Sequence, residues 1–170
     1  MSSASGVDRK GTDVTFATPE QKFGIPTNTR TKPPRTLEQN ASMILGSIYF
    51  VGGALGFIGT GGGPITGFSS NTFLLFPLNV YHNIVHLAIG ALWFLGAFAL
   101  TAAGNEGLNI AIGGVYLLAT VIGFLGYLPL LNIHAGNDVD NYLHLLTALV
   151  TLIFGTGFLR LLGGRQLSTA

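Results

Sequence analysis

Apolar residues gather in four long runs along the chain: Ala41–Gly59, Val80–Ala103, Leu108–Leu128 and Tyr142–Leu162. A helix rises about 1.5 Å per residue, so roughly 20 apolar residues cross the hydrocarbon core of a bilayer. Each run is about that long. The pattern therefore predicts an all-α integral membrane protein with four transmembrane helices.

The segments between the runs contain turn-forming residues. Gly61–Pro64 ends the first run, and the link that follows extends to Leu78. Gly104–Gly107 predicts a tight turn, because Gly and Asn favour turns. Asn132–Asp140 predicts a polar loop. Short connections of this kind predict a compact bundle.

The polar residues before the first run form a separate segment. Residues 1–40 are rich in Ser, Thr, Pro and basic residues, a composition that predicts disorder when such a segment is alone in water. We therefore expect an extended cytoplasmic-side tail over 1–40 and a four-helix transmembrane domain over 41–163. Residues 164–170 are expected to form a C-terminal tail.

A seven-residue phrase occurs twice and indicates an internal duplication. Tyr81–Leu87 and Val139–Leu145 each place an Asn three residues before a His, with a Leu after it. Two further matches have a constant offset: Gly46–Tyr49 with Gly113–Tyr116, and Gly56–Gly59 with Gly123–Gly126. We predict two parallel two-helix repeats, 41–103 and 108–162, related by an axis along the membrane normal.

Four stripes of small, aromatic and polar residues step by three and four, which keeps their members on one helical face. We call them the inner stripes: Gly46, Tyr49, Gly53 and Gly56; Asn83, His86, Gly90, Trp93 and Ala97; Gly113, Tyr116, Thr120 and Gly123; and Asn141, His144, Ala148, Thr151 and Gly155. Small residues permit close helix contact in lipid. The inner stripes are therefore expected to face the bundle interior.

The stripes contain two polar pairs, Asn83 with His86 and Asn141 with His144. In a structural interpretation, each pair satisfies its polar groups against a neighbouring helix and fixes the helix register. In a second interpretation, His86, His144 or both supply an axial nitrogen to a haem or chlorophyll, and Asn83 and Asn141 support them. Both interpretations stay open on the sequence alone, and no metal other than that of a tetrapyrrole is expected.

Other residues are expected to flank these pairs. Gly56 and Gly123 fall at a depth similar to that of the two His, and would leave room for a ring beside each imidazole. Four polar residues lie nearer the outer surface: His82, His134, Asp138 and Asp140. The two His are expected at the interface, and the two Asp are expected to face solvent and cap the fourth helix.

Composition and charge narrow the function classes. The 170 residues are 48% hydrophobic and 9% charged, whereas soluble domains carry about 25% charged residues. All eight Lys and Arg precede Leu37 or follow Leu159. The positive-inside rule therefore predicts both termini on the cytoplasmic or stromal side of a bacterial inner membrane or a photosynthetic membrane. No Cys is present, which excludes disulfides and Cys-ligated zinc.

The central parts of the runs hold no Asp, Glu, Lys or Arg, and no set of nucleophile, base and acid is visible. Ion-coupled carriers usually place such groups inside the membrane. We therefore expect no enzyme, and a small-molecule carrier is a third alternative behind the two interpretations of the histidines.

The tail carries six of the eight basic residues. Its expected partner-binding residues are Phe16, Phe23, Arg30, Lys32 and Arg35. Apolar anchors among Pro and Thr suit an extended segment that lies along a protein surface. The sequence thus favours a non-catalytic accessory subunit of a larger membrane complex, photosynthetic or respiratory. Its expected partners are lipids and other integral membrane subunits, and not nucleic acid.

The paired Asn-x-x-His-Leu phrases and the Gly-Phe-x-Gly endings of the first and third runs resemble a bacterial family of unknown function. Members of that family are small four-helix membrane proteins, found in actinobacteria and cyanobacteria among others. The resemblance covers Ala41 to about Leu162. It implies the four-helix topology and no activity, and the long tail before Ala41 departs from it.

Overall fold

The computed structural model describes residues 5–7, 13–15, 34–61 and 63–158. The chain divides into two units, 1–34 and 35–170, which are considered separately. In the first unit, β1 (Ser5–Val7) pairs antiparallel with β2 (Asp13–Thr15). The second unit contains the helices.

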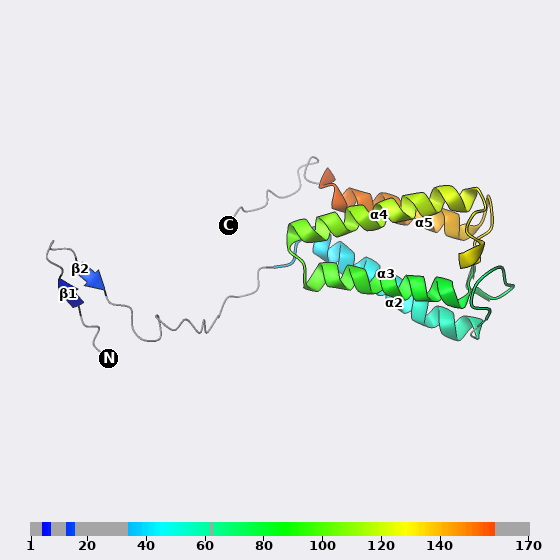
Figure 1. Cartoon of the computed structure of the whole chain (residues 1–170), viewed down its shortest axis with the longest axis horizontal. Coiled ribbons are helices and arrows are strands. Elements are labelled where there is room, and N and C mark those ends of the chain that lie inside the picture. Colours follow the sequence, from blue (N-terminus) through cyan, green and yellow to red (C-terminus); the bar gives the residue numbers. More distant parts are fainter. Residues whose placement is uncertain (1–4, 8–12, 16–33, 62, 159–170) are drawn as a thin grey trace. The chain divides into compact units, whose positions relative to one another are not determined.

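The described residues of the second unit contain four α-helices: α2 (Leu37–Thr60), α3 (Val80–Phe98), α4 (Ala102–Phe124) and α5 (Val139–Gly155). The helix α2 packs along α3, and α4 packs along α5 (Figure 1). Fewer contacts, chiefly of α4 with α2 and α3, join the two hairpins into one bundle. The fold is therefore all-helical in its main elements, as the apolar runs predicted.

Short elements occupy the two long loops, which lie at one end of the bundle (Figure 1). The first loop contains an antiparallel hairpin of β3 (Thr72–Phe73) and β4 (Phe76–Pro77). The second contains the one-turn 3-10 helix η1 (Pro129–Leu131). Asn132 joins the loops, since its side chain accepts from Ser69 N at 2.8 Å and donates to Ser69 O at 3.2 Å.

The turn predicted at Gly104–Gly107 is wrong, because these residues belong to the first turns of α4. The helix begins early because Thr101 caps it, its side-chain oxygen accepting from Gly104 N at 3.1 Å. The preceding helix ends at Phe98 and not at Ala103. The connection between α3 and α4 therefore spans only residues 99–101.

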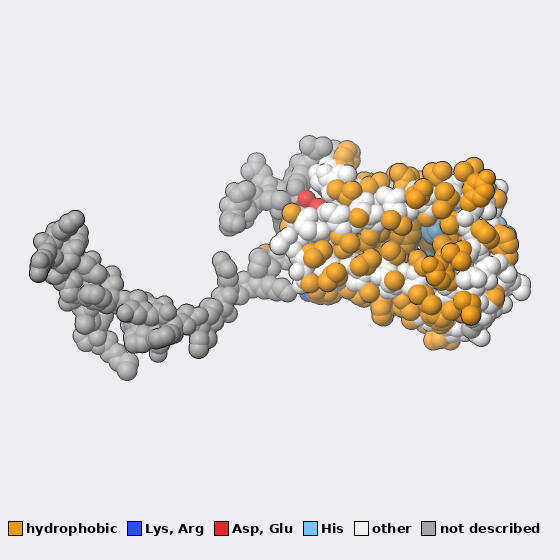
Figure 2. Space-filling model, viewed as in Figure 1, with side chains coloured by type: hydrophobic (Ala, Val, Ile, Leu, Met, Phe, Trp, Pro, Cys, Tyr) orange, Lys and Arg blue, Asp and Glu red, His pale blue; other side chains and the backbone are white. Residues whose placement is uncertain are grey.

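The surface of the bundle is apolar (Figure 2). Ile58 is 77% exposed, and Leu118 and Leu146 are 61% and 58% exposed. The helices α2, α3 and α4 are long and apolar enough to cross a membrane, whereas the apolar helix α5 has 17 residues. The end predicted for the fourth run, residues 159–162, lies outside the described residues. The helices are compatible with a membrane protein.

All members of the inner stripes are buried, which confirms that these faces form the interior. Their glycines bring backbones into contact. A Cβ on Gly53 would lie 2.8 Å from Asn83 O of the facing helix, and one on Gly90 would lie 2.6 Å from Phe50 N. In the other hairpin, a Cβ on Gly155 would lie 2.7 Å from Ile110 N. Both hairpins are thus closed by backbone contact at glycine, as small residues permit in lipid.

We expect Gly53→Ala to destabilise the bundle by about 1–3 kcal/mol, because the added methyl group must push α2 and α3 apart. The matched control is Gly52→Ala, since nothing lies within 4 Å of a Cβ at Gly52. Thermal or detergent-induced unfolding followed by circular dichroism measures the difference. Equal stability of the two variants would contradict the contact.

Candidate metal centre

Two helices present a pair of ligand-type side chains each, spaced by one helical turn. His82 and His86 lie four residues apart on α3, and Asp140 and His144 lie four residues apart on α5. This spacing places both members of a pair on one face. All four side chains are buried: His82 and Asp140 are 0% exposed, His144 is 3% exposed and His86 is 9% exposed.

The three His converge in the interior of the bundle, near the end that the two long loops cover. One potential ligand nitrogen from each of His82, His86 and His144 lies within 4.8 Å of the others. The ring centroids of His82 and His86 are 4.4 Å apart, and those of His82 and His144 are 6.3 Å apart. Asp140 Oδ1 lies 3.9 Å from His82 Nε2, beyond hydrogen-bonding distance but close enough for charge to matter.

Several polar atoms of this cluster have no hydrogen-bond partner among the described residues. Among them are Nε2 of His86, Nδ1 of His144 and both carboxylate oxygens of Asp140. An unsatisfied polar atom in an apolar interior costs free energy, and native structures hold few of them. The cluster therefore has the character of a binding site, in which a ligand or ion supplies the missing interactions.

Tyrosine rings pack against the cluster. The ring of Tyr49 lies 5.1 Å from that of His86, and the ring of Tyr116 lies 5.2 Å from that of His144. The hydroxyl of Tyr49 is 2.5 Å from Thr147 Oγ1, which links α2 to α5. Trp93 packs on both tyrosines in the same layer. These rings limit the rotation of the imidazoles of His86 and His144.

The two Asn of the repeated phrases are fully buried and have a role distinct from that of the His. The side chains of Asn83 and Asn141 contact Gly56 and Gly123, where a Cβ would meet the amide oxygen in both cases. The predicted free space for a ring at these glycines is therefore wrong, because the amides fill it. Gly53, one turn earlier, is the glycine beside His86, with its would-be Cβ 3.1 Å from the Cβ of His86.

Of the four polar residues predicted near the outer surface, His134 is exposed and stacks on Phe68 at 4.4 Å. Asp138 caps α5 as predicted, accepting from Asp140 N at 3.0 Å, but its side chain is 3% exposed and does not face solvent. The surface prediction is wrong for His82 and Asp140, which lie in the interior. Each stands one turn before a His of an inner stripe, and that spacing was the signal that could have identified both.

The residues predicted to bind a partner fall mostly outside the described part of the chain. Four of them lie outside the described residues: Phe16, Phe23, Arg30 and Lys32. Arg35 is described, and its guanidinium carbon lies 4.5 Å from the ring centroid of Phe98. This contact fixes the start of α2 against the end of α3, and a role of Arg35 toward a partner stays a prediction.

Residues 39–157 match DUF4383, a domain of unknown function. The chain belongs to the DUF4383 family. The match contains all four residues of the cluster and leaves out the tail. No curated protein and no solved structure matches the chain. Membership in DUF4383 confirms the resemblance seen in the sequence.

We expect Asn141→Ala to destabilise the DUF4383 bundle by about 1–3 kcal/mol. The amide nitrogen of Asn141 donates to His134 O and Gly136 O, both at 3.0 Å, and the substitution removes both bonds. Asn137→Ala is the control, because the side chain of Asn137 holds only the exposed hydroxyl of Tyr142, at 2.9 Å. The melting temperatures of the two variants in detergent test this expectation. It is refuted if Asn141→Ala lowers the melting temperature no more than Asn137→Ala does.

Proposed function

We propose that this protein is an integral membrane protein that binds one divalent transition-metal ion inside its four-helix bundle. The observation that carries the proposal is the convergence of three buried imidazoles, from His82, His86 and His144, within 4.8 Å and beside the buried carboxylate of Asp140. Four-helix bundles commonly hold metal in their cores with side chains of facing helices.

The ligand types select the class of metal. Imidazole nitrogens suit Zn²⁺, Cu²⁺, Ni²⁺ and Fe²⁺, whereas Mg²⁺ and Ca²⁺ prefer a shell of oxygens. A Zn–N bond of about 2.0–2.1 Å puts the nitrogens of a tetrahedral site roughly 3.4 Å apart. The spacing of up to 4.8 Å needs only small side-chain rotations to reach that value. Zn²⁺ or a similar ion is therefore the expected occupant.

Charge balance supports the same conclusion. A dication in an apolar interior needs negative charge nearby, because burying an uncompensated charge is costly. Asp140 is the acidic group of the described residues that contacts the histidine cluster, 3.9 Å from His82. It either completes the coordination shell or orients His82, as carboxylates do behind metal-bound His.

The proposed duplication gives the site a simple origin. The second position of the repeated phrase holds His82 in one copy and Asp140 in the other, and the sixth holds His86 and His144. In two parallel repeats, each copy would supply two of the four groups across the pseudo-twofold axis. The departure from symmetry, His in one copy and Asp in the other, adds the negative charge.

A single ion fits this interior better than a haem or chlorophyll bound to His86 and His144. The aromatic rings of Tyr49, Trp93 and Tyr116 form a packed layer against the cluster. A flat macrocycle would have to displace that layer, whereas an ion occupies the space of one atom. An accessory role in a larger membrane complex is compatible with metal binding and stays a prediction for the tail.

Purified protein should bind about one equivalent of Co²⁺ or Zn²⁺ and show the absorption bands of a nitrogen-coordinated Co²⁺. Asp140→Asn should weaken metal binding by roughly 10–100-fold, as is typical when a partner of a metal ligand is changed. Replacing any one of the three ligands His82, His86 and His144 by Ala should weaken it by more than that. Spectroscopic titration with competition by a chelator measures the affinities.

His134→Ala is the matched control, because His134 is exposed and lies outside the cluster. Its affinity should equal that of the wild type. Circular dichroism verifies that each variant is folded. The metal site would be disproved if the wild type bound the ion weakly. It would also be disproved if His134→Ala lost as much affinity as the variants of the three ligands.

The membrane proposal places both termini on the cytoplasmic or stromal side, because the Lys and Arg lie there. The chain has no Cys, so single substitutions report position cleanly. A Cys at exposed Asn137 should be labelled from outside intact cells, and a Cys at exposed Ala103 only after permeabilisation. The reverse result would invert the orientation, and labelling of both from one side would exclude the four-span topology.

A further inference from the structure

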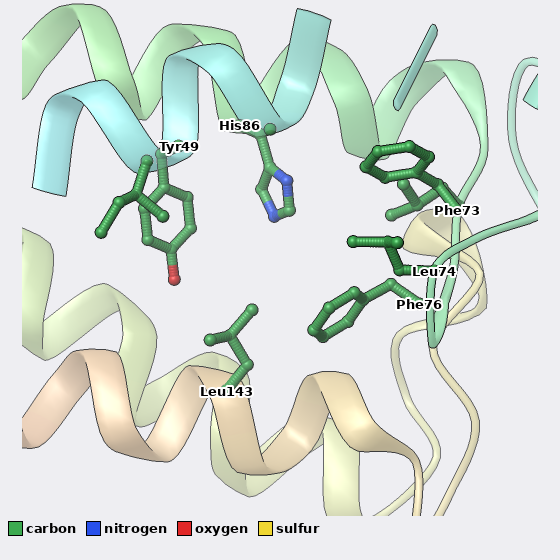
Figure 3. A pocket seen from close by; sticks show the side chains of 9 residues that line it. Tyr49, Phe73, Leu74, Phe76, His86 and Leu143 are labelled. Carbon is green, nitrogen blue, oxygen red and sulfur yellow. The ribbon is translucent and has the colours of Figure 1, made fainter. Parts of the chain in front are cut away.

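A cavity of about 210 Å³ lies beside the cluster, bounded by α2, α3, α5 and the β3–β4 hairpin. Its wall includes Tyr49, Phe73, Phe76, Leu78, His86 and Leu143. Figure 3 shows Tyr49 and His86 projecting into this space towards Leu143, with the hairpin residues at one side. One of the three proposed metal ligands thus forms part of the cavity wall.

The wall is apolar except at His86. The hydroxyl of Tyr49 is engaged by Thr147 at 2.5 Å, so it offers little to a ligand. His86 is 9% exposed, and its imidazole makes no hydrogen bond to another described residue. His86 is therefore the residue of this wall whose hydrogen-bonding capacity is unused.

We infer that the cavity binds a small neutral molecule with an apolar body of ring size and one hydrogen-bond acceptor oxygen, which receives a bond from His86. The inference rests on the proposed metal site in one respect, the position of the imidazole proton. When the ion binds one ring nitrogen of His86, the other nitrogen carries the N–H that is donated to the ligand. Without the ion, the same imidazole still has one N–H to donate.

Size and charge define the ligand class. A dry apolar cavity of about 150 Å³ accommodates benzene, so 210 Å³ accommodates a ring with a short substituent. A charged ligand is disfavoured, because the wall holds no Asp, Glu, Lys or Arg to compensate its charge. An aromatic ketone or a quinone-like ring has the required shape, and its carbonyl oxygen is the acceptor.

Acetophenone and ethylbenzene test this inference, because they have nearly the same shape and only the ketone carries an acceptor. Protein with ¹³C-labelled Leu methyl groups is titrated with each probe, in both the metal-loaded and the chelated form. The methyl signals of Leu78 and Leu143, which line the cavity, should shift saturably. Acetophenone should bind roughly threefold to tenfold more tightly, as expected for one net hydrogen bond.

Two substitutions and a control locate the site. His86→Phe should bind both probes with equal affinity, because the donor is lost and the apolar wall remains. Leu143→Trp should abolish the saturable shifts of Leu78 by filling the cavity. Leu146→Trp, on the exposed face of the same helix, should leave binding of both probes unchanged.

The inference is overturned if neither probe gives saturable shifts, if the wild type binds both equally, or if Leu143→Trp binds as well as Leu146→Trp. Probe binding in the chelated form separates this inference from the metal site. If the metal titration fails while the ketone preference persists, only the metal proposal falls. If metal binds and the probes do not, only the cavity inference falls.

Discussion

The backbone contact inside each helical hairpin is the constraint on which the rest of the bundle depends. At Gly53 and Gly90, α2 and α3 approach so closely that a methyl group on either would meet backbone atoms at 2.8 Å or less. Gly155 permits an equally close approach of α5 to α4, since a methyl group there would lie 2.7 Å from Ile110 N. In the proposed membrane location, lipid would supply no hydrophobic drive between helices, so packing at small residues would have to hold them together. That packing fixes the rotation of α3 and α5, and with it the direction of the imidazoles.

The interior of the bundle is polar at both ends, and the two ends differ in how their groups are satisfied. Near the starts of α2 and α4, Ser42 Oγ donates to Asn105 Oδ1 at 2.9 Å, and Asn109 Nδ2 donates to Ser42 Oγ at 3.1 Å. Trp93 Nε1 completes that network by donating to Asn109 Oδ1 at 3.0 Å. Such a network is a structural link between helices, because its groups satisfy one another apart from Asn105 Nδ2, which has no partner among the described residues.

The histidine cluster contrasts with that network. His86, His144 and Asp140 keep unsatisfied nitrogen and oxygen atoms although they are buried. A protein that retains such groups pays a cost in stability unless something binds them. The proposed metal ion would remove this cost at the nitrogens and the carboxylate together. The cavity beside His86 gives the same site an apolar approach, so ion and ligand would share one imidazole.

The sequence by itself determined the helices and their inward faces. Apolar runs of membrane-spanning length predicted four helices, and steps of three and four placed the inner stripes correctly in the interior. These features could be predicted because helical periodicity is local: spacing along the chain fixes which residues share a face. Asn83 with His86 and Asn141 with His144 were found in this way.

Only the tertiary structure decided where His82 and Asp140 point. Both stand near the start of a helix, where sequence position suggests the outer surface. The loops that pack over that end bury them: Asn79, which caps α3, donates to Gly67 O and Leu130 O of the two long loops. Loop packing depends on contacts between residues far apart in the chain. The spacing of four residues places His82 on the face of His86 and Asp140 on the face of His144. It carries no information about contacts with the loops, so only the tertiary structure showed that this second pair is buried.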